Sequence, residues 1–290
     1  MEKFIISIED ACDLDEQTIS KYDIQVAPME YYINGETFKT DEKKHTKNEI
    51  AKLLRTGVEI KTSQVNEYDA QNYLTHLLEK GKDVIHISFS SGMSNTFNNF
   101  NNVAKQLKGK YKNNVVVIDS LCQSGGVGVL VKMLIDEVEA GRVNDIYEAE
   151  KYVNSVKLNI AHSFTLDSLK FLARGGRITA VKAFIGGLLQ IKPVLRVNDS
   201  GIIVPFRKVM GRKKAIRELV EIFAQNYNHM SKHVIIIEAD CAGDAEELKK
   251  SVLEKEPNLD IVIVPLNACV ASHGGPDSLA IFYTEDKRIK

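Results

Sequence analysis

The apolar run Val84–Ser88 (VIHIS) is followed at once by the hydroxyl-rich segment Phe89–Thr96 (FSSGMSNT) and then by an amphipathic segment, Asn95–Leu107. A short continuous apolar run is typical of a strand buried on both faces, and the segment after it has a helical period. Two similar runs, Lys3–Ile8 and Val115–Ile118, also precede amphipathic segments. These repeated strand–turn–helix units predict a parallel sheet with helices on its faces.

The second half of the chain has a different pattern. Leu188–Arg207 contains two apolar runs around the turn Asn198–Gly201 (NDSG), which predicts an antiparallel hairpin. A basic amphipathic helix is expected at Lys213–Gln225, and strands and helices then alternate up to a last strand at Leu279–Tyr283. We therefore expect an α/β protein of two domains, with a parallel-sheet domain over residues 1–157 and a mixed-sheet domain over residues 158–290.

Composition narrows the class of protein. Of the 290 residues, 44% are hydrophobic and 27% are charged, which is typical of a globular chain. The 38 basic and 39 acidic residues leave a net charge of −1, which excludes a broad nucleic-acid-binding surface. The four cysteines form no CxxC pair, so neither a disulfide framework nor a zinc site is expected.

No segment has the length and apolar character of a membrane span or a secretory signal. We expect a cytoplasmic protein without a metal or other cofactor. Its basic helix is expected to be a solvated face, with at most a transient contact to a membrane surface.

Two hydroxyl-rich segments precede predicted helices. Thr62 and Ser63 stand before the helix that contains Glu67–Leu78, and Ser91 and Ser94 stand before the helix at Asn95–Leu107. Such hydroxyls either cap the helix or direct donors at a carboxylate or phosphate. Capping is a sufficient explanation for the first segment, whereas the second has more hydroxyls than one cap needs. The second segment therefore predicts an anion site.

Three further segments are candidates for the site. His273 is expected in a flexible, polar, glycine-rich surface loop before the last strand, where the glycines permit close approach of a ligand. Gly175-Gly176 is expected to end one helix, and Arg177 to open the next, where its charge is unfavourable to the helix dipole. The apolar segment Phe184–Pro193, with paired glycines, suits either helix packing or the wall of an apolar cavity.

Taken together, these segments resemble the DegV family of bacterial fatty-acid-binding proteins. The resemblance rests on the order of several short motifs along nearly the whole chain, each of them weak alone. They are Ile8–Leu14 (IEDACDL), Lys61–Gln64 (KTSQ), Ser90–Thr96 (SSGMSNT), Ile118–Ser120 (IDS), Gly175–Ile178 (GGRI), Ile191–Leu195 (IKPVL) and His273–Pro276 (HGGP).

The resemblance implies a long-chain fatty acid between the two domains, with its carboxylate at Thr62 and Ser94 and with His273 nearby. It also implies that Arg177 lies near the entrance and that a partner fatty acid kinase phosphorylates the bound carboxylate, so that this chain is a carrier and not an enzyme. Secondary or presenting roles fall to the residues Ser63, Ser91, Arg177 and Arg212.

The sequence departs from the family pattern at four positions. Ala11 and Cys12 replace hydroxyl residues, Met210 stands where an arginine is expected, and Asp277 replaces a glycine. These changes leave lipid binding as the expectation and bear on coupling to the kinase. Two alternatives stay open: a serine hydrolase that uses Ser94, His273 and Asp277, and a protein that binds another apolar carboxylate or a phosphorylated lipid.

Overall fold

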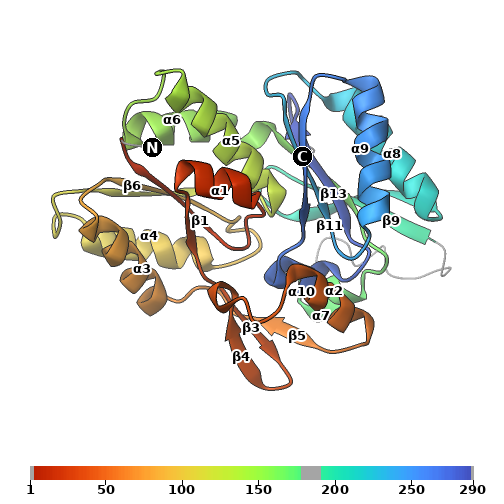
Figure 1. The fold of residues 1–290 in the computed structure, drawn as a ribbon, viewed down its shortest axis with the longest axis horizontal. Helices are drawn as coiled ribbons and strands as arrows, with labels where there is room; N and C mark the ends of the chain where they lie inside the picture. The colour runs from red at the N-terminus through yellow and green to blue at the C-terminus, as the bar shows by residue number, and fades with distance from the viewer. Residues whose placement is uncertain (1–2, 178–190, 289–290) are drawn as a thin grey trace.

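The computed structural model describes residues 3–177 and 191–288 (Figure 1). Two lobes lie side by side, each built on its own sheet, and a small third sheet lies below them in this view. The α/β class, with a parallel sheet in the first lobe and a mixed sheet in the second, confirms the prediction. The sheet of the second lobe begins at Ile160, and the exact boundary at residues 157/158 stays a prediction.

The first lobe holds a four-stranded parallel sheet in the order β2-β1-β6-β7. Neighbouring side chains on each strand enter different cores, since Ile5 packs with α3 and α4 whereas Ile6 packs with α5 and α6. This alternation is what a strand covered on both faces requires. The elements are β1 (Ile5–Glu9), α1 (Glu16–Tyr22), β2 (Gln25–Ala27), α3 (Glu67–Glu79), β6 (Val84–Ser88), α4 (Thr96–Leu107), β7 (Val115–Asp119), α5 (Gly125–Glu139) and α6 (Ile146–Val156).

The second lobe holds a six-stranded mixed sheet in the order β10-β9-β8-β13-β11-β12. The predicted hairpin is confirmed as the antiparallel pair β9 and β10, with an irregularity between Pro205 and Arg207. Helices α8 and α9 pack on one face of the sheet. The elements are β8 (Ile160–Thr165), β9 (Ile191–Val197), β10 (Ile203–Met210), α8 (Arg212–Asn226), β11 (His233–Glu238), α9 (Ala242–Lys255), β12 (Asp260–Pro265) and β13 (Leu279–Thr284).

Helix α5 lies between the lobes and contacts β6 on one side and β8, β11 and β13 on the other. Most of its side chains are buried, as expected for a helix that is apolar all round. Gly128 permits this close packing, because a Cβ there would lie 2.8 Å from the backbone oxygen of Asp13 and 2.6 Å from Ile235. The two lobes therefore share a core.

The third sheet, which the sequence analysis did not predict, has the order β4-β3-β5. Asn34 and Gly35 both have positive φ between β3 and β4, as a tight hairpin turn requires. Thr46 and Glu49 form a capping box at the start of α2. Helix α10 packs on β3 and β5, and helices α2 and α7 pack against α10 (Figure 1). The elements are β3 (Glu30–Ile33), β4 (Glu36–Lys39), α2 (Lys47–Arg55), β5 (Ile60–Thr62), α7 (Lys170–Arg174), α10 (Ala268–Gly274) and the 3₁₀ turns Thr40–Glu42 and Lys157–Asn159.

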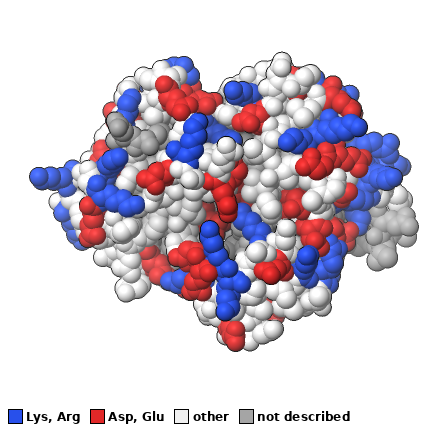
Figure 2. All heavy atoms as spheres, in the orientation of Figure 1, with Lys and Arg blue, Asp and Glu red and all other residues white. Residues whose placement is uncertain are grey.

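The surface carries basic and acidic side chains interleaved over both lobes (Figure 2). Within residues 3–177 and 191–288, no helix is both long enough and apolar enough to cross a bilayer. The same residues contain no cluster of three or more His, Cys, Asp or Glu side chains arranged to hold a metal ion.

Candidate functional site

A cavity lies between the two lobes and encloses about 960 Å³ of empty space, open solvent at its mouth included. Its walls are mostly apolar and come from both lobes, because each sheet presents buried side chains to it. The first lobe contributes Phe89 and Met93, and the second contributes Phe164, Leu166, Ile203 and Phe282. A mostly apolar lining with a few polar groups is typical of a site for a small apolar molecule.

Polar side chains gather on part of the cavity wall. Thr62 comes from the end of β5, which is held in place by its antiparallel pairing with β3, and His273 comes from α10. The hydroxyl of Thr62 lies 3.2 Å from Nε2 of His273, across 211 residues of sequence. Ser63, Ser94 and Arg177 also line the cavity. The three residues expected to bind a carboxylate therefore line one cavity, and two of them, Thr62 and His273, are in contact.

His273 lies in a helix, so the prediction of a flexible surface loop was wrong. Asn267 caps α10 by accepting a hydrogen bond from the Val270 backbone at 2.9 Å, and the helix runs to Gly274. The imidazole packs against Gly175, where a Cβ would lie 1.9 Å from Nδ1. Burial, and to a smaller degree the charge of Arg177, lower the pKa of His273 to about 4. The imidazole is therefore neutral at pH 7.

One ring nitrogen of His273 has no protein partner. Its Nδ1 atom is buried and makes no hydrogen bond within the described part of the chain. A neutral imidazole has one donor and one acceptor nitrogen, so the ring can donate at one position and accept at the other. A ligand oxygen beside this ring would find a neutral hydrogen-bonding group and not a cation.

The hydroxyl of Ser94 lies in the turn between β6 and α4. Its Oγ atom lies 2.9 Å from the Thr96 hydroxyl and accepts a weak bond from the Thr96 backbone at 3.3 Å. Thr62 and Ser63 do not cap α3, because the cap is Asn66, which accepts from the Asp69 backbone. The capping explanation for that segment is therefore wrong, and its hydroxyls face other groups: Ser63 donates to Glu30 at 3.2 Å.

Arg177 lies at the rim of the cavity. Its guanidinium donates to the backbone oxygens of Met93 and Gly175, at 3.2 and 2.5 Å. This contact links the end of α7 to the serine-rich turn that carries Ser94. The predicted helix after Arg177 and most of the apolar segment Phe184–Pro193 lie outside the described residues.

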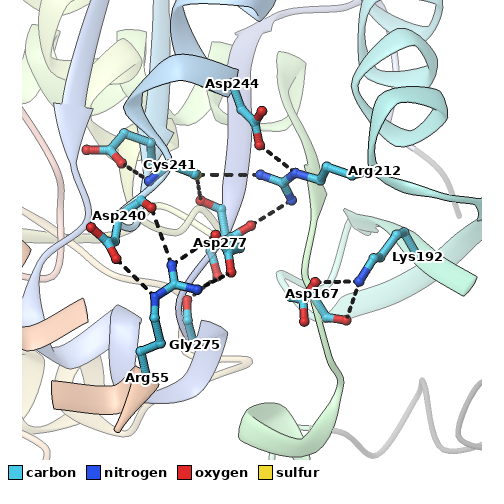
Figure 3. Close-up of polar contacts among 11 residues, drawn as sticks. Arg55, Asp167, Lys192, Arg212, Asp240, Cys241, Asp244, Gly275 and Asp277 are labelled. Atoms are coloured by element: carbon cyan, nitrogen blue, oxygen red, sulfur yellow. Dashed lines mark hydrogen bonds and ion pairs between the residues drawn. The ribbon is translucent and has the colours of Figure 1, made fainter. Parts of the chain in front are cut away.

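Two expected secondary residues do not line the cavity. Ser91 is exposed, and its backbone nitrogen donates to Asp119 at 3.1 Å. Arg212, at the start of α8, donates to the Asp244 carboxylate and to the backbone oxygen of Asp277, both at 2.7 Å (Figure 3). The side chain of Arg212 therefore holds the second lobe together locally.

Asp277 forms an ion pair with a residue that the sequence analysis did not consider. Arg55, at the end of α2, donates two hydrogen bonds to the Asp277 carboxylate, at 2.8 and 3.0 Å. It also donates to the Asp240 carboxylate at 3.0 Å (Figure 3). The pair neutralises the carboxylate, so Asp277 would not repel an anion bound nearby. Asp277 also has a φ of +60°, a conformation that glycine adopts readily and aspartate tolerates.

The catalytic triad of the hydrolase alternative is not assembled. The Asp277 carboxylate binds Arg55, the His273 ring bonds to Thr62, and the Ser94 hydroxyl bonds to Thr96. A serine hydrolase needs a histidine base that bonds to the serine nucleophile and a carboxylate that bonds to this histidine. Neither contact is present among these three residues.

The other departures from the family pattern lie in two places. Ala11 lines the cavity, and Cys12 is buried with its thiol 3.6 Å from Glu9. Met210 ends the edge strand β10 and is 50% exposed, away from the cavity wall.

The sequence analysis did not single out several polar residues of the wall, among them Glu9 and Gln123. Glu9 is fully buried. Its carboxylate accepts a hydrogen bond from the Phe89 backbone nitrogen at 3.0 Å and lies 3.3 Å from Nε2 of His86. Burial alone would raise the pKa of Glu9, but the interaction with His86 and the hydrogen bonds outweigh it and keep this pKa low. His86 is thus a buried histidine with a partner at each ring nitrogen, Ser7 at 2.9 Å and Glu9 at 3.3 Å. Glu9 directly follows the predicted strand Lys3–Ile8, which was the available signal. Gln123 lies in the loop between β7 and α5, where no local pattern marked it.

Known proteins resemble this chain over its whole length. Residues 3–286 match the family described as uncharacterised proteins of the DegV family. A DegV domain-containing protein of Clostridium perfringens is 32% identical over 292 residues, which cover 99% of each chain.

Two solved structures from Thermotoga maritima share the fold. One, a DegV lipid binding protein, is 26% identical, with a TM-score of 0.84 over 99% of this chain and 100% of that one. The other, a hypothetical protein reported to reveal fatty acid binding function, is 25% identical, with a TM-score of 0.82 over 98% and 99% of the two chains. With its fold and the match to the family over residues 3–286, this chain belongs to the DegV family.

Proposed function

We propose that this protein binds a long-chain fatty acid in the cavity between its lobes. The observation that carries the proposal is the division of the cavity wall into a broad apolar part and a polar part at Thr62, Ser94 and His273. An alkyl chain with one carboxylate matches that division. The lipid and fatty acid binding reported for the two Thermotoga maritima relatives supports the same ligand class.

The apolar wall supplies most of the affinity in this proposal. Burial of one methylene contributes about 0.8 kcal/mol, so a chain of roughly 14 methylenes contributes about 11 kcal/mol. Part of this offsets the lost freedom of ligand and side chains. The remainder is enough for micromolar or tighter binding.

The polar wall fixes the position of the carboxylate. The hydroxyls of Thr62 and Ser94 and the neutral imidazole of His273 offer hydrogen bonds without a formal charge, and Ser63 stands beside them. Neutral donors orient a carboxylate while leaving electron density on its oxygens. A tight ion pair would withdraw that density.

We further propose that a partner kinase phosphorylates the bound acid. A carboxylate oxygen attacks the γ-phosphorus of ATP held by the partner, the bond between that phosphorus and the ADP oxygen breaks, and an acyl phosphate and ADP result. Because the chemistry lies in the partner, this chain supplies position. Arg177, exposed at the rim, and the surface residues Ser91 and Arg212 are the candidates for contact with the kinase.

Native mass spectrometry of protein purified without added lipid tests the binding proposal. We expect an adduct of fatty-acid mass, and saturable uptake of palmitic or oleic acid after the adduct is removed. A protein that carries no adduct and takes up neither acid would contradict the proposal.

The kinase step has a separate test. With a DegV-type partner kinase, Arg177→Ala is expected to keep most of its fatty acid affinity while acyl-phosphate formation slows. Lys213→Ala, on the exposed face of α8, is the matched surface control. An equal loss of binding and turnover in Arg177→Ala would place Arg177 in the primary binding site and not in presentation.

A further inference from the structure

Gln123 is a largely buried residue whose polar side chain lines the cavity and has no hydrogen-bond partner among the described residues. It is 7% exposed, and its side-chain amide makes no hydrogen bond to any residue in the described ranges 3–177 and 191–288. The amide atoms are not among the fully buried side-chain atoms that lack a partner, so they reach the space of the cavity. A bound ligand that covers the amide removes its access to water, and leaving it unpaired would then cost about 1–3 kcal/mol. The ligand is therefore expected to supply a hydrogen-bonding group.

The loop that carries Gln123 is held rigidly. Leu121 and Ser124 on either side have φ values of +52° and +49°, a conformation that costs energy in residues other than glycine. The Gln123 backbone donates to His162 at 3.1 Å, and the Ser124 hydroxyl donates to Asp13 at 2.6 Å. On the other flank, Arg288 donates to the Leu121 oxygen at 2.6 Å. The amide is therefore presented from a fixed backbone.

Apolar side chains line the same cavity as the Gln123 amide. They include Phe282 and Ile237, and the Phe282 ring lies nearly perpendicular to the His162 ring, with the ring centroids 5.3 Å apart. A plain hydrocarbon placed here would displace the water that otherwise satisfies the amide, and would offer no hydrogen bond in return. The unpaired amide would then lower the affinity for a plain hydrocarbon chain, although the apolar walls favour such a chain.

We propose that the cavity accepts a long-chain acid bearing a hydroxyl group on its chain, and that the Gln123 amide binds this hydroxyl. The inference rests on the proposed fatty acid function and names its substrate class. An amide can donate to the hydroxyl oxygen and accept from its hydrogen, so both partners are satisfied by one contact. A site built around a ligand hydroxyl discriminates against the analogue that lacks it.

Competitive displacement of a fluorescent fatty acid tests the proposal. The probes are stearic acid, a positional series of monohydroxystearic acids, and a methyl-branched stearic acid as the size control. We expect at least one hydroxy isomer to bind about tenfold or more tightly than stearic acid, while the methyl-branched acid gains nothing. The preferred isomer reports how far along the chain Gln123 lies from the carboxylate.

Two variants test whether the Gln123 amide is the group that binds the hydroxyl of the ligand. Gln123→Leu and Gln123→Met, which keep similar size without the amide, are expected to remove the preference while binding stearic acid at least as well as the original protein. Thermal unfolding of each confirms the fold, and the less perturbed one is used. Gln106→Leu, on the exposed face of α4, is the matched control and should keep the preference.

Three results would overturn the inference. They are equal affinities across the whole series, a preference that survives both Gln123 variants, and an equal weakening of every acid by those variants, which would place Gln123 at the carboxylate. In each of these cases stearic acid still binds, so the proposed function stands. If the original protein binds none of the acids, the proposed function fails and this inference fails with it.

Discussion

At the scale of single residues, the site depends on one close approach between two helices. The His273 ring lies directly against Gly175, so the end of α7 fixes the ring beside the Thr62 hydroxyl. No side chain larger than hydrogen fits at position 175 unless the ring moves. The glycine there serves the packing of the histidine, because its backbone φ is not in the left-handed region.

This contact predicts the effect of Gly175→Ala. The added methyl would lie 1.9 Å from Nδ1 of His273, so the ring must turn away from Thr62 and the affinity for fatty acid should fall about tenfold or more. Gly243→Ala in α9, where a Cβ meets nothing within 4 Å, is the control and should stabilise its helix by up to about 1 kcal/mol. Unchanged affinity in Gly175→Ala would show that the position of His273 does not matter for binding.

The hydroxyls of the polar wall give a second prediction at this scale. Thr62→Val and Ser94→Ala each remove one donor to a charged ligand, a contact worth about 1.5–3 kcal/mol, so each should weaken binding by about tenfold to a hundredfold. Displacement of a fluorescent fatty acid measures the effect, and circular dichroism checks the fold. If both variants bind with the original affinity, neither hydroxyl contacts the carboxylate.

At the scale of secondary structure, the position of α10 depends mainly on its N-cap residue, Asn267. Asn267 caps the helix through Val270, and the buried Asp13 carboxylate accepts from the Asn267 backbone at 2.9 Å and from its side chain at 2.8 Å. Asp13 also accepts from Ser124 and lies 3.4 Å from the Lys47 ammonium. One carboxylate in the first lobe thus fixes the helix that carries His273.

Removal of this cap should affect both stability and binding. Asn267→Ala loses the cap and leaves Asp13 with fewer donors, so we expect the free energy of unfolding to fall by about 1–3 kcal/mol and fatty acid affinity to fall with it. Asn66→Ala, which removes the equivalent cap from α3, should cost about 1 kcal/mol and leave binding unchanged. Urea titration and ligand displacement separate the two effects, and equal binding in both variants would contradict the role of α10.

At the scale of the whole molecule, two buried histidines of the folded chain stay neutral at a pH where the unfolded chain protonates them. His162 is fully buried, bonds through Nδ1 to the Ile160 oxygen and accepts from the Gln123 backbone, and burial holds its pKa well below 6.5. Burial likewise lowers the pKa of His273 to about 4. In the unfolded chain both groups titrate near pH 6.5.

These shifts predict the pH dependence of stability. Below pH 6.5 the unfolded chain binds more protons than the folded one, so the free energy of unfolding should fall as the pH falls from 7 to 5, by up to about 1.4 kcal/mol per pH unit for each histidine. Urea titrations across this window measure the slope, and His162→Gln should reduce it. A stability that stays constant from pH 7 to pH 5 would contradict the neutral state of both rings.

The sequence by itself determined the class of fold and most elements that have a clear period. Val84–Ser88, Val115–Asp119 and the hairpin around Asn198–Gly201 were predictable because burial on two faces and a tight turn each leave a local pattern. It also indicated Thr62, Ser94 and His273, although through a resemblance of motif order more than through local chemistry.

Only the tertiary structure decided which of these residues meet. Thr62 and His273 lie far apart in sequence, and their contact depends on β5 pairing with β3 and on α10 being capped by a residue that Asp13 holds. The pairing of Asp277 with Arg55 has no local pattern either, and neither has the Gln123 amide, which lacks a partner in the described part of the chain. Periodicity reports which face of an element is buried, whereas the partner of a polar group is set by packing between distant segments, and that information is not local in the chain.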